Sequence, residues 1–282
     1  MFRQDLLKNK RVLITGGGTG LGRAMAERFL QLGATVYICG RRADVLDRAR
    51  QELADSTHGE IRSITCDVRE RDGVEEMIES IWQERPLNVL VNNAAGNFIA
   101  RTEELSARAW DAVLGIVLNG TINVTMACGQ RWLAAGEPAT VLNVSTTYAA
   151  SGSGSAFVVP SAVAKAGVLA LTTSLASEWG SRGIRLNAIA PGPIPTEGAF
   201  SRLLPRKDLE QPALERIPLH RFGSPEEFAN LASFLVSDGC TYVNGETIVM
   251  DGGAWLRGAS EFGNLDQVMT DSDWQNLRTK KK

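Results

Sequence analysis

Ser161 and Lys165 are the first pair of residues with chemical potential, in the stretch FVVPSAVAKAG (157–167). A helix is expected over 162–180, and residues four apart on a helix share one face, so the two side chains should point the same way. Lysine supplies a positive charge there, and serine supplies a hydroxyl. A serine hydroxyl is a far weaker acid than a phenol, so position 161 is poorly suited to donate a proton to a ketone oxygen.

A phenol could come from only three tyrosines. Tyr37 falls within a strand expected at 34–40, and Tyr242 lies close to the last expected strand. Tyr148 directly follows a strand expected at 139–145, at the sheet edge where α/β proteins bind ligands. Tyr148 is therefore the candidate donor, and a half-buried loop tyrosine is the alternative interpretation.

A glycine-rich loop, TGGGTGLG (15–22), joins the strand expected at 11–15 to a helix. Glycines let the backbone approach a pyrophosphate closely, and the helix N-terminus offers free N–H groups. A tight strand-to-helix turn without a ligand is the alternative, but the position after the first strand favours nucleotide binding. The residues expected to contact the cofactor here are Gly16, Gly17, Gly18, Thr19, Gly20 and Leu21.

The choice of cofactor should be encoded after the second strand, where an NAD enzyme usually carries a carboxylate for the ribose 2′-hydroxyl. This chain has Arg41 and Arg42 there. Two guanidinium groups suit a 2′-phosphate, so NADPH is expected, with solvated surface arginines as the alternative. Asp67, at the end of the third expected strand, can accept a hydrogen bond from the adenine amino group.

Apolar strands alternate with helices along the whole chain, which indicates a parallel sheet covered on both faces. The strands are expected at 11–15, 34–40, 61–67, 87–96, 139–145, 184–192 and 246–253. The fold class is therefore α/β, a single doubly wound Rossmann-like domain over 1–282 with a seven-stranded parallel sheet. Residues 193–223 lack clear periodicity and are expected to form a substrate loop. Residues 254–282 form a C-terminal extension whose role the sequence leaves open.

Composition excludes several other classes of protein. The net charge of −2 argues against a general polyanion binder such as a nucleic-acid-binding protein. The four cysteines are scattered without CxxC spacing, so reduced core thiols are expected and no metal site. The uncharged stretch 112–129 contains asparagines and threonines, which favours a buried core helix over a membrane span. No presequence is visible, and a cytoplasmic location is expected.

Taken together, TGGGTGLG, NNAAG (92–96), the Lys165 helix and PGPI (191–194) resemble the short-chain dehydrogenase/reductase family over essentially the whole chain. The resemblance implies that Lys165 binds the nicotinamide ribose and that the protein forms a homotetramer. It also implies two further sets of cofactor contacts, one beside the fourth strand and one closing over the nicotinamide. These sets are Asn93, Ala94 and Gly96, and then Pro191, Gly192, Pro193 and Ile194.

Most members of that family carry Tyr-x-x-x-Lys, whereas this chain has Ser161 before Lys165. With this serine and the segments NNAAGNF and PGPIPTEGAFSR, the chain is similar to the NADPH-dependent 2,4-dienoyl-CoA reductases of the mitochondrial type. The resemblance implies a catalytic set of Asn119, Tyr148, Ser161 and Lys165, with Tyr148 and Asn119 binding the substrate oxygen. The segment between Tyr148 and Ser161 is about two residues longer here than in that subgroup.

The same resemblance implies reduction of a 2,4-dienoyl-CoA to a 3-enoyl-CoA in the β-oxidation of unsaturated fatty acids. Hydride would reach C5, and negative charge would flow back to the thioester oxygen, where an oxyanion-hole type of donor suffices. Arg69 and Arg202 are expected to bind the phosphates of CoA, and Phe98 is expected to contact the substrate.

Two alternatives stay open from the sequence. The first is an NADPH-dependent carbonyl reductase of the same family acting on a 3-oxoacyl thioester, against which Ser161 argues. The second is a non-catalytic nucleotide sensor on the same fold, which fold alone does not exclude. Retention of Lys165 and of a nearby phenol argues against the sensor.

Overall fold

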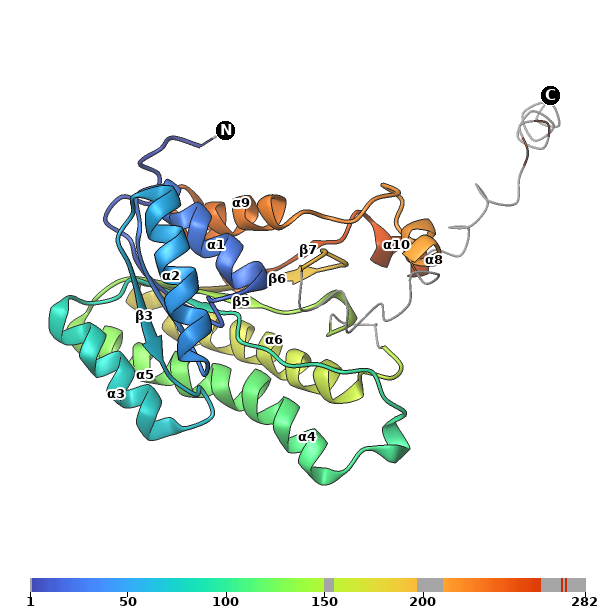
Figure 1. The fold of residues 1–282 in the computed structure, drawn as a ribbon, viewed down its shortest axis with the longest axis horizontal. Coiled ribbons are helices and arrows are strands. Elements are labelled where there is room, and N and C mark those ends of the chain that lie inside the picture. The colour runs from blue at the N-terminus through green and yellow to red at the C-terminus, as the bar shows by residue number, and fades with distance from the viewer. Residues whose placement is uncertain (1, 150–154, 197–209, 260–269, 271, 273–282) are drawn as a thin grey trace.

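The seven strands form one parallel sheet in the order β3-β2-β1-β4-β5-β6-β7 (Figure 1). The computed structural model describes residues 2–149, 155–196, 210–259, 270 and 272. The predicted fold class, a doubly wound α/β domain with seven parallel strands, is confirmed. The strands are β1 (Arg11–Thr15), β2 (Thr35–Gly40), β3 (Ile61–Thr65), β4 (Val89–Asn92), β5 (Ala139–Val144), β6 (Ile184–Pro191) and β7 (Thr247–Met250).

The strand order reverses direction at β1, which pairs with β2 on one side and with β4 on the other. Val12 shows the register, because it lies opposite Val36 of β2 and Val89 of β4. In doubly wound sheets, ligands bind beyond the carboxyl ends of the strands at this reversal. The loops that follow β1, β4 and β5 are therefore the ones that build the site.

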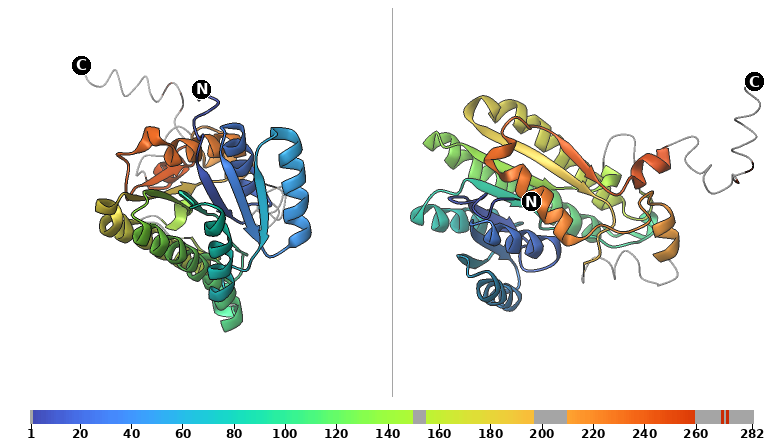
Figure 2. Two further views of the ribbon diagram at one scale, coloured as in Figure 1. Left: turned by 90° about the vertical axis from the view of Figure 1, so that its left-hand side faces the viewer. Right: turned by 90° about the horizontal axis from the view of Figure 1, so that it is seen from above.

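Helices cover both faces of the sheet, as Figures 1 and 2 show. One face carries α1 (Gly20–Gln31), α2 (Ala43–Thr57) and α9 (Pro225–Val236), and the other carries α3 (Arg71–Glu84), α5 (Gly120–Ala135) and α6 (Val159–Trp179). The remaining described helices are α4 (Ala107–Leu114), α8 (Glu210–Glu215) and α10 (Ala254–Ala259). α4 runs into α5 through a π turn, η2 (Gly115–Asn119).

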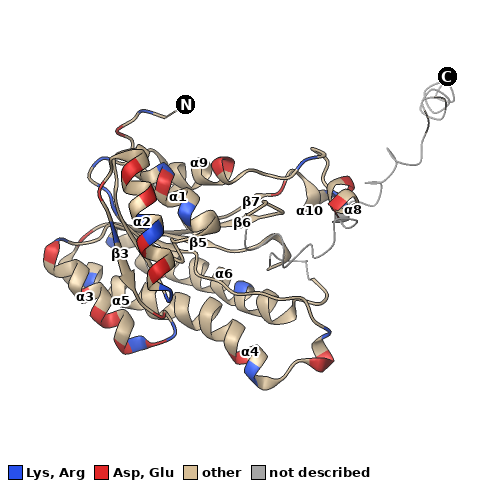
Figure 3. Ribbon diagram, viewed as in Figure 1, with Lys and Arg blue, Asp and Glu red and all other residues tan. Residues whose placement is uncertain are grey.

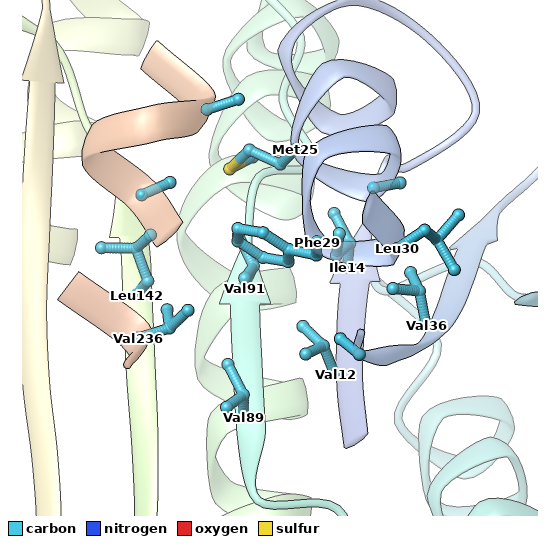
Figure 4. Close-up of a cluster of buried hydrophobic side chains, with 14 of the residues drawn as sticks. Val12, Ile14, Met25, Phe29, Leu30, Val36, Val89, Val91, Leu142 and Val236 are labelled. Atoms are coloured by element: carbon cyan, nitrogen blue, oxygen red, sulfur yellow. The ribbon is translucent and has the colours of Figure 1, made fainter. Parts of the chain in front are cut away.

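The core lies in two layers, one on each side of the sheet. Figure 4 shows part of the first layer, where Phe29 of α1 packs with Val91 of β4 and Val236 of α9. The second layer is centred on Trp132 and Trp179, which are fully buried between the sheet and the α3, α5 and α6 side. Both faces of the central strands β1, β4 and β5 are buried, so these strands are mainly apolar rather than alternating, whereas the edge strands β3 and β7 are partly exposed.

The long apolar helices belong to this packing. Two segments, Ala107–Ala135 and Val159–Arg182, are apolar and long enough to cross a bilayer by composition alone. About half of each apolar stretch is buried in the fold, Val117 and Val124 among them, which agrees with the core helix predicted at 112–129. Figure 3 shows that charges gather on α1, α2 and α3, whereas α5 and α6 carry few.

The four cysteines are buried free thiols, as predicted. Burial, with a smaller contribution from the Asp67 carboxylate, raises the pKa of the Cys66 thiol to about 11. These thiols are therefore protonated at neutral pH.

Two predicted boundaries differ from the structure for local reasons. α6 begins at Val159 rather than at 162, because Pro160 fits the first turn of a helix, where its missing N–H is not needed. The core helix predicted at 112–129 is interrupted by the π turn at Gly115–Asn119. The predicted substrate loop 193–223 is described at 193–196 and 210–223, where it includes α8.

Candidate active site

The glycine-rich loop forms a cradle at the carboxyl end of β1. Gly16 has a φ of +66°, which favours glycine, and a Cβ at Gly17 would lie 2.5 Å from Cγ2 of Ile38. Thr19 precedes α1 without capping it through its side chain, so the first N–H groups of α1 keep their hydrogen-bonding capacity for a ligand. Tight backbone, open N–H groups and a helix N-terminus fit a pyrophosphate.

Asn93 holds this cradle from the neighbouring strand. Its Nδ2 donates to the carbonyl of Thr15 at 2.9 Å and to that of Gly16 at 3.2 Å. In return, Thr15 Oγ1 accepts from the backbone N–H groups of Asn93 and Ala94, each at 3.0 Å. Asn93 and Ala94 were predicted to contact the cofactor. Their hydrogen bonds to Thr15 and Gly16 show that they also fix the loop that would receive the phosphates.

A cavity of about 400 Å³ adjoins the cradle on the β2 and β3 side. Arg41, Arg42 and Asp67 line it, together with apolar side chains such as Leu46 and Ile116. Both arginines are exposed, and neither forms an ion pair in the described part of the chain. Apolar walls for a base, with two uncommitted guanidinium groups, fit the adenosine end of a dinucleotide.

Asp67 is paired with Arg69 at the rim of this cavity. Arg69 Nη2 lies 2.5 Å from Oδ2 of Asp67, and the hydrogen bonds from Arg69 are the main cause that lowers the pKa of the Asp67 carboxyl. Arg69 lines neither of the two cavities. The structure thus places Arg69 beside the nucleotide cavity, in contact with Asp67, and its contact with a CoA phosphate stays a prediction.

A larger cavity, about 530 Å³, opens at the carboxyl ends of β4, β5 and β6. It contains the predicted Tyr148, Ser161 and Lys165. The predicted nucleotide contacts that line it come from three loops, after β1, β4 and β6. They are Gly16, Thr19, Gly20, Leu21, Asn93, Ala94, Gly96, Pro191, Gly192, Pro193 and Ile194.

Tyr148 lies at the centre of a hydrogen-bonded group in this cavity. Its hydroxyl accepts from Asn97 Nδ2 at 3.1 Å and lies 3.1 Å from Ser161 Oγ. Asn97 Oδ1 accepts from the N–H of Phe98 at 2.9 Å, which fixes the amide with its NH₂ group toward Tyr148. Because Asn97 and Ser161 can both donate to the phenol oxygen, the phenol proton can be directed to a ligand.

Lys165 is buried in the wall of the same cavity, with 7% of its surface exposed. Its ammonium donates a hydrogen bond to the carbonyl of Val144, at the end of β5. Burial lowers the pKa of Lys165 to about 8. The amine is therefore poised near neutral pH, where the loss of one proton removes the positive charge from the site.

The prediction for Asn119 is wrong. Asn119 lies at the end of the π turn with an exposed side chain, and it lines neither cavity. Val117, two residues earlier, is buried, and two helical residues rotate the side-chain direction by about half a turn. The amide beside Tyr148 belongs to Asn97. A signal existed in the sequence, because Asn97 follows the fourth strand at the ligand-binding edge.

Two other predicted substrate contacts have different outcomes. Phe98 is partly buried and packs against Val113, Val117 and Ala164, so its ring supports the loop that carries Asn97. Arg202 lies outside the described residues. Ser145, directly after β5, has a buried hydroxyl in the cavity wall without a hydrogen-bond partner among the described residues.

Comparisons with known proteins agree with this architecture. The family model described as enoyl-(acyl carrier protein) reductase matches residues 16–254. A Bacillus subtilis (strain 168) relative, named probable 2,4-dienoyl-CoA reductase, (2E)-enoyl-CoA-producing, is 44% identical and covers 89% of this chain and 98% of its own length. A Caenorhabditis elegans relative, named probable 2,4-dienoyl-CoA reductase 3, (3E)-enoyl-CoA-producing, is 43% identical and covers 90% and 82%.

A solved structure agrees as well. The crystal structure of a proposed NAD(P)-dependent gluconate 5-dehydrogenase from Beutenbergia cavernae, with NADP bound at low occupancy, has a TM-score of 0.84 and 32% identity. It covers 92% of this chain and 100% of its own. The sheet order, the glycine cradle and the family match lead to one assignment: the chain belongs to the short-chain dehydrogenase/reductase family, whose members are oxidoreductases that use a nicotinamide nucleotide.

Proposed function

We propose that this oxidoreductase reduces 2,4-dienoyl-CoA thioesters with NADPH. The observation that carries the proposal is the placement of the Tyr148 hydroxyl within hydrogen-bond distance of both Asn97 and Ser161, in the cavity that also holds Lys165. A phenol arranged in this way is better suited to donate a hydrogen bond to an electron-rich oxygen than to transfer its proton to the oxygen of a ketone. Two relatives, at 44% and 43% identity, carry the corresponding name.

The nicotinamide supplies a hydride when the cofactor is bound. In a 2,4-dienoyl thioester, addition of hydride at C5 moves an electron pair through the diene to the thioester oxygen. Tyr148 donates its hydroxyl proton as a hydrogen bond to that oxygen, and Asn97 and Ser161 hold the phenol in place from its other side. Donors aligned in advance with a developing negative charge lower the barrier without any reorganisation during the reaction.

Lys165 contributes charge and orientation rather than a proton. Its buried ammonium adds a positive potential to the cavity wall, and it can bind the hydroxyl groups of a ribose. Ser161 orients the phenol through the 3.1 Å contact between the two hydroxyl oxygens. This arrangement explains why a serine is tolerated at 161: the residue assists a donor instead of acting as one.

The proton that completes the reduction comes from water, and the product depends on which carbon of the dienolate receives it. Protonation at C2 gives a 3-enoyl thioester, whereas protonation at C4 gives a 2-enoyl thioester. We propose the 3-enoyl product, because C2 is bonded to the thioester carbon and so lies next to the groups that hold its oxygen. The names of the two relatives differ at this point, so the product has to be measured.

NADPH is favoured over NADH by Arg41 and Arg42 in the adenosine-end cavity. Guanidinium groups bind a 2′-phosphate through paired, charge-assisted hydrogen bonds. Each arginine is exposed and without an ion pair among the described residues, although Arg41 attracts the nearby Asp67 carboxylate. An NADP-bound neighbour at 32% identity supports the same choice.

The assembly and the location are also proposals. The outer face of α6 exposes small and apolar residues, including Val163, Ala166 and Ala170. We propose that this face, with α4 and α5, packs against a second copy in a cytoplasmic homotetramer. Light scattering on the purified protein tests the assembly, and a monomeric mass at micromolar concentration contradicts it.

The substrate class is tested by comparing two thioesters with both nucleotides. NADPH oxidation should be fast with 2,4-hexadienoyl-CoA, slow with acetoacetyl-CoA and slow when NADH replaces NADPH. Product analysis by NMR should show a double bond at C3. Preference for acetoacetyl-CoA would instead identify a carbonyl reductase and overturn the proposal.

A further inference from the structure

A backbone hydrogen bond joins two segments of the site that are distant in the sequence. The N–H of Ala100, in the loop after β4, donates to the carbonyl of Phe157, two residues before α6, at 2.9 Å. Asn97 lies three residues before the donor, and Ser161 lies four residues after the acceptor. This hydrogen bond, the backbone bridge, therefore ties together the segments that carry the two partners of the Tyr148 hydroxyl.

Phe157 adopts a backbone conformation that residues with a Cβ disfavour. Its φ is +67°, in the left-handed region, where the Cβ comes close to the following carbonyl oxygen. A residue keeps such a conformation only where the surrounding structure stabilises it. Burial of the ring does not provide this stabilisation, since Phe157 is 56% exposed. The backbone bridge is a contact that does, because the carbonyl of Phe157 is its acceptor.

The residues on either side of the bridge are anchored. Val158, next to Phe157, is buried, and its carbonyl accepts from the N–H of Ala162 at 3.1 Å as α6 begins. On the other side, the ring of Phe98 packs on the cluster that includes Ala164 of α6. Because both flanks are held, a change in the conformation of Phe157 moves its carbonyl away from Ala100 or displaces the start of α6.

We propose that Phe157 is a positioning residue, whose left-handed backbone conformation sets the distance between Asn97 and Ser161 across the Tyr148 hydroxyl. Each partner lies 3.1 Å from the phenol oxygen, so a shift of either segment lengthens one of these contacts. The phenol then loses its fixed direction toward the substrate oxygen. The inference rests on the proposed role of Tyr148 as a hydrogen-bond donor, and it assigns the function to the backbone of Phe157 and not to its ring.

The test separates the backbone of Phe157 from its ring, in the purified full-length protein with NADPH and 2,4-hexadienoyl-CoA. Glycine and asparagine tolerate the left-handed region, whereas the β-branched valine strongly disfavours it. Phe157→Val should lower kcat about fivefold, the effect of one hydrogen bond, while Phe157→Asn and Phe157→Gly stay within about twofold of the wild type. The KM for the thioester should be unchanged in all three, because the ring has no part in the proposal.

His58→Val is the matched control. His58 has a φ of +53°, is exposed, and follows α2 at the edge of the sheet where β3 begins, opposite the site. Valine should lower thermal stability at both positions, but kcat should fall only in Phe157→Val. Hydrogen exchange followed by mass spectrometry reads the bridge without catalysis: a peptide containing Ala100 should exchange faster in Phe157→Val and at the wild-type rate in His58→Val.

Two results would overturn the proposal. One is an unchanged kcat in a folded Phe157→Val variant. The other is an equal loss in Phe157→Asn and Phe157→Val with a higher KM for the thioester, since that result assigns the ring to the acyl chain. If Phe157→Val is poorly folded by circular dichroism, Ala100→Pro takes its place, because it removes the N–H of the bridge and should give the same fivefold loss of kcat. Failure of the wild type to reduce any dienoyl thioester would contradict the proposed function instead, and hydrogen exchange would still test the bridge.

Discussion

Tyr148, at the scale of single residues, explains how a serine can occupy position 161. The phenol oxygen has an amide donor on one side and a serine hydroxyl on the other, both at 3.1 Å. These two partners can satisfy the oxygen while its proton points into the cavity. The phenol therefore lies on the loop after β5, and the serine one helical turn before Lys165 contacts it.

Removal of the phenol proton donor should affect catalysis and not folding. Tyr148→Phe should lower kcat with 2,4-hexadienoyl-CoA about a hundredfold, the usual effect of one oxyanion donor. Asn97→Ala should also lower kcat, by a smaller factor, because Asn97 acts through Tyr148. Asn119→Ala is the matched control at an exposed amide and should leave kcat unchanged. Equal losses for the two asparagine variants would contradict this assignment.

The ionisation of Lys165 should shape the dependence of rate on pH. Burial lowers its pKa to about 8, so the ammonium loses its proton as pH rises through that value. The value of kcat/KM for NADPH should then fall above about pH 8. Stability should move the other way: between about 8 and the ordinary value of 10.5, the unfolded chain holds more protons, so the free energy of unfolding rises with pH. Lys165→Met should remove both effects.

The sequence predicted Tyr148, Ser161 and Lys165 in one site from the position of Tyr148 after a strand, from the four-residue spacing of Ser161 and Lys165 on a helix, and from the family resemblance. It predicted the wrong amide. Asn119 was assigned from the family resemblance, but the side of a helix on which a residue lies depends on local winding. The π turn before α5 shifts that winding, and nothing in the composition of 115–119 announces it. Periodicity does not apply to the loop that holds Asn97, and the only signal for this residue was its position directly after the fourth expected strand.

At the scale of secondary-structure elements, the close approach of loops and helices positions the cofactor. A Cβ at Gly22, in the first turn of α1, would lie 2.4 Å from the carbonyl oxygen of Gly16 and 2.6 Å from Nδ2 of Asn93. That contact places the start of α1 against the cradle loop and against the strand end that stabilises it. Apolar strands made the order of these elements predictable, but contacts between loops have no such periodic signal.

Gly22→Ala should therefore damage both stability and nucleotide binding. Overpacking of this kind costs about 1–3 kcal/mol of unfolding free energy, and the shifted loop should bind NADP⁺ more weakly. Gly73→Ala, in α3, is the control, because a Cβ there meets nothing closer than 4.0 Å. The control should be neutral or stabilising by thermal denaturation, since alanine is the better helix former. A Gly22→Ala variant with normal stability and affinity would contradict the close packing.

At the scale of the whole molecule, the site is divided into two adjoining cavities with different linings. The smaller, about 400 Å³, holds the arginines, and the larger, about 530 Å³, holds Tyr148 and Lys165. The glycine cradle lines both, as expected for a pyrophosphate that joins two nucleosides. This division, at the sheet reversal, could be predicted from the order of strands and helices. The shape of the acyl subsite could not, because it depends on side chains from separate loops.

Cofactor preference should follow this division. Replacing both Arg41 and Arg42 by alanine should raise the KM for NADPH at least tenfold, roughly the loss of one charge-assisted contact. The KM for NADH should change little, because NADH has no 2′-phosphate, and kcat should be preserved. Steady-state kinetics with both nucleotides measure this. An equal loss with NADH would show that the arginines stabilise the fold or the cavity instead.

The central claim is that hydride enters the far end of a conjugated thioester while a phenol holds the near end. Reduction of 2,4-hexadienoyl-CoA with NADPH deuterated at the transferred position, followed by NMR of the product, tests it most directly. We expect deuterium at C5, with Tyr148→Phe giving the same product more slowly. Deuterium at C3, or no reduction of the diene by the wild type, would contradict the account.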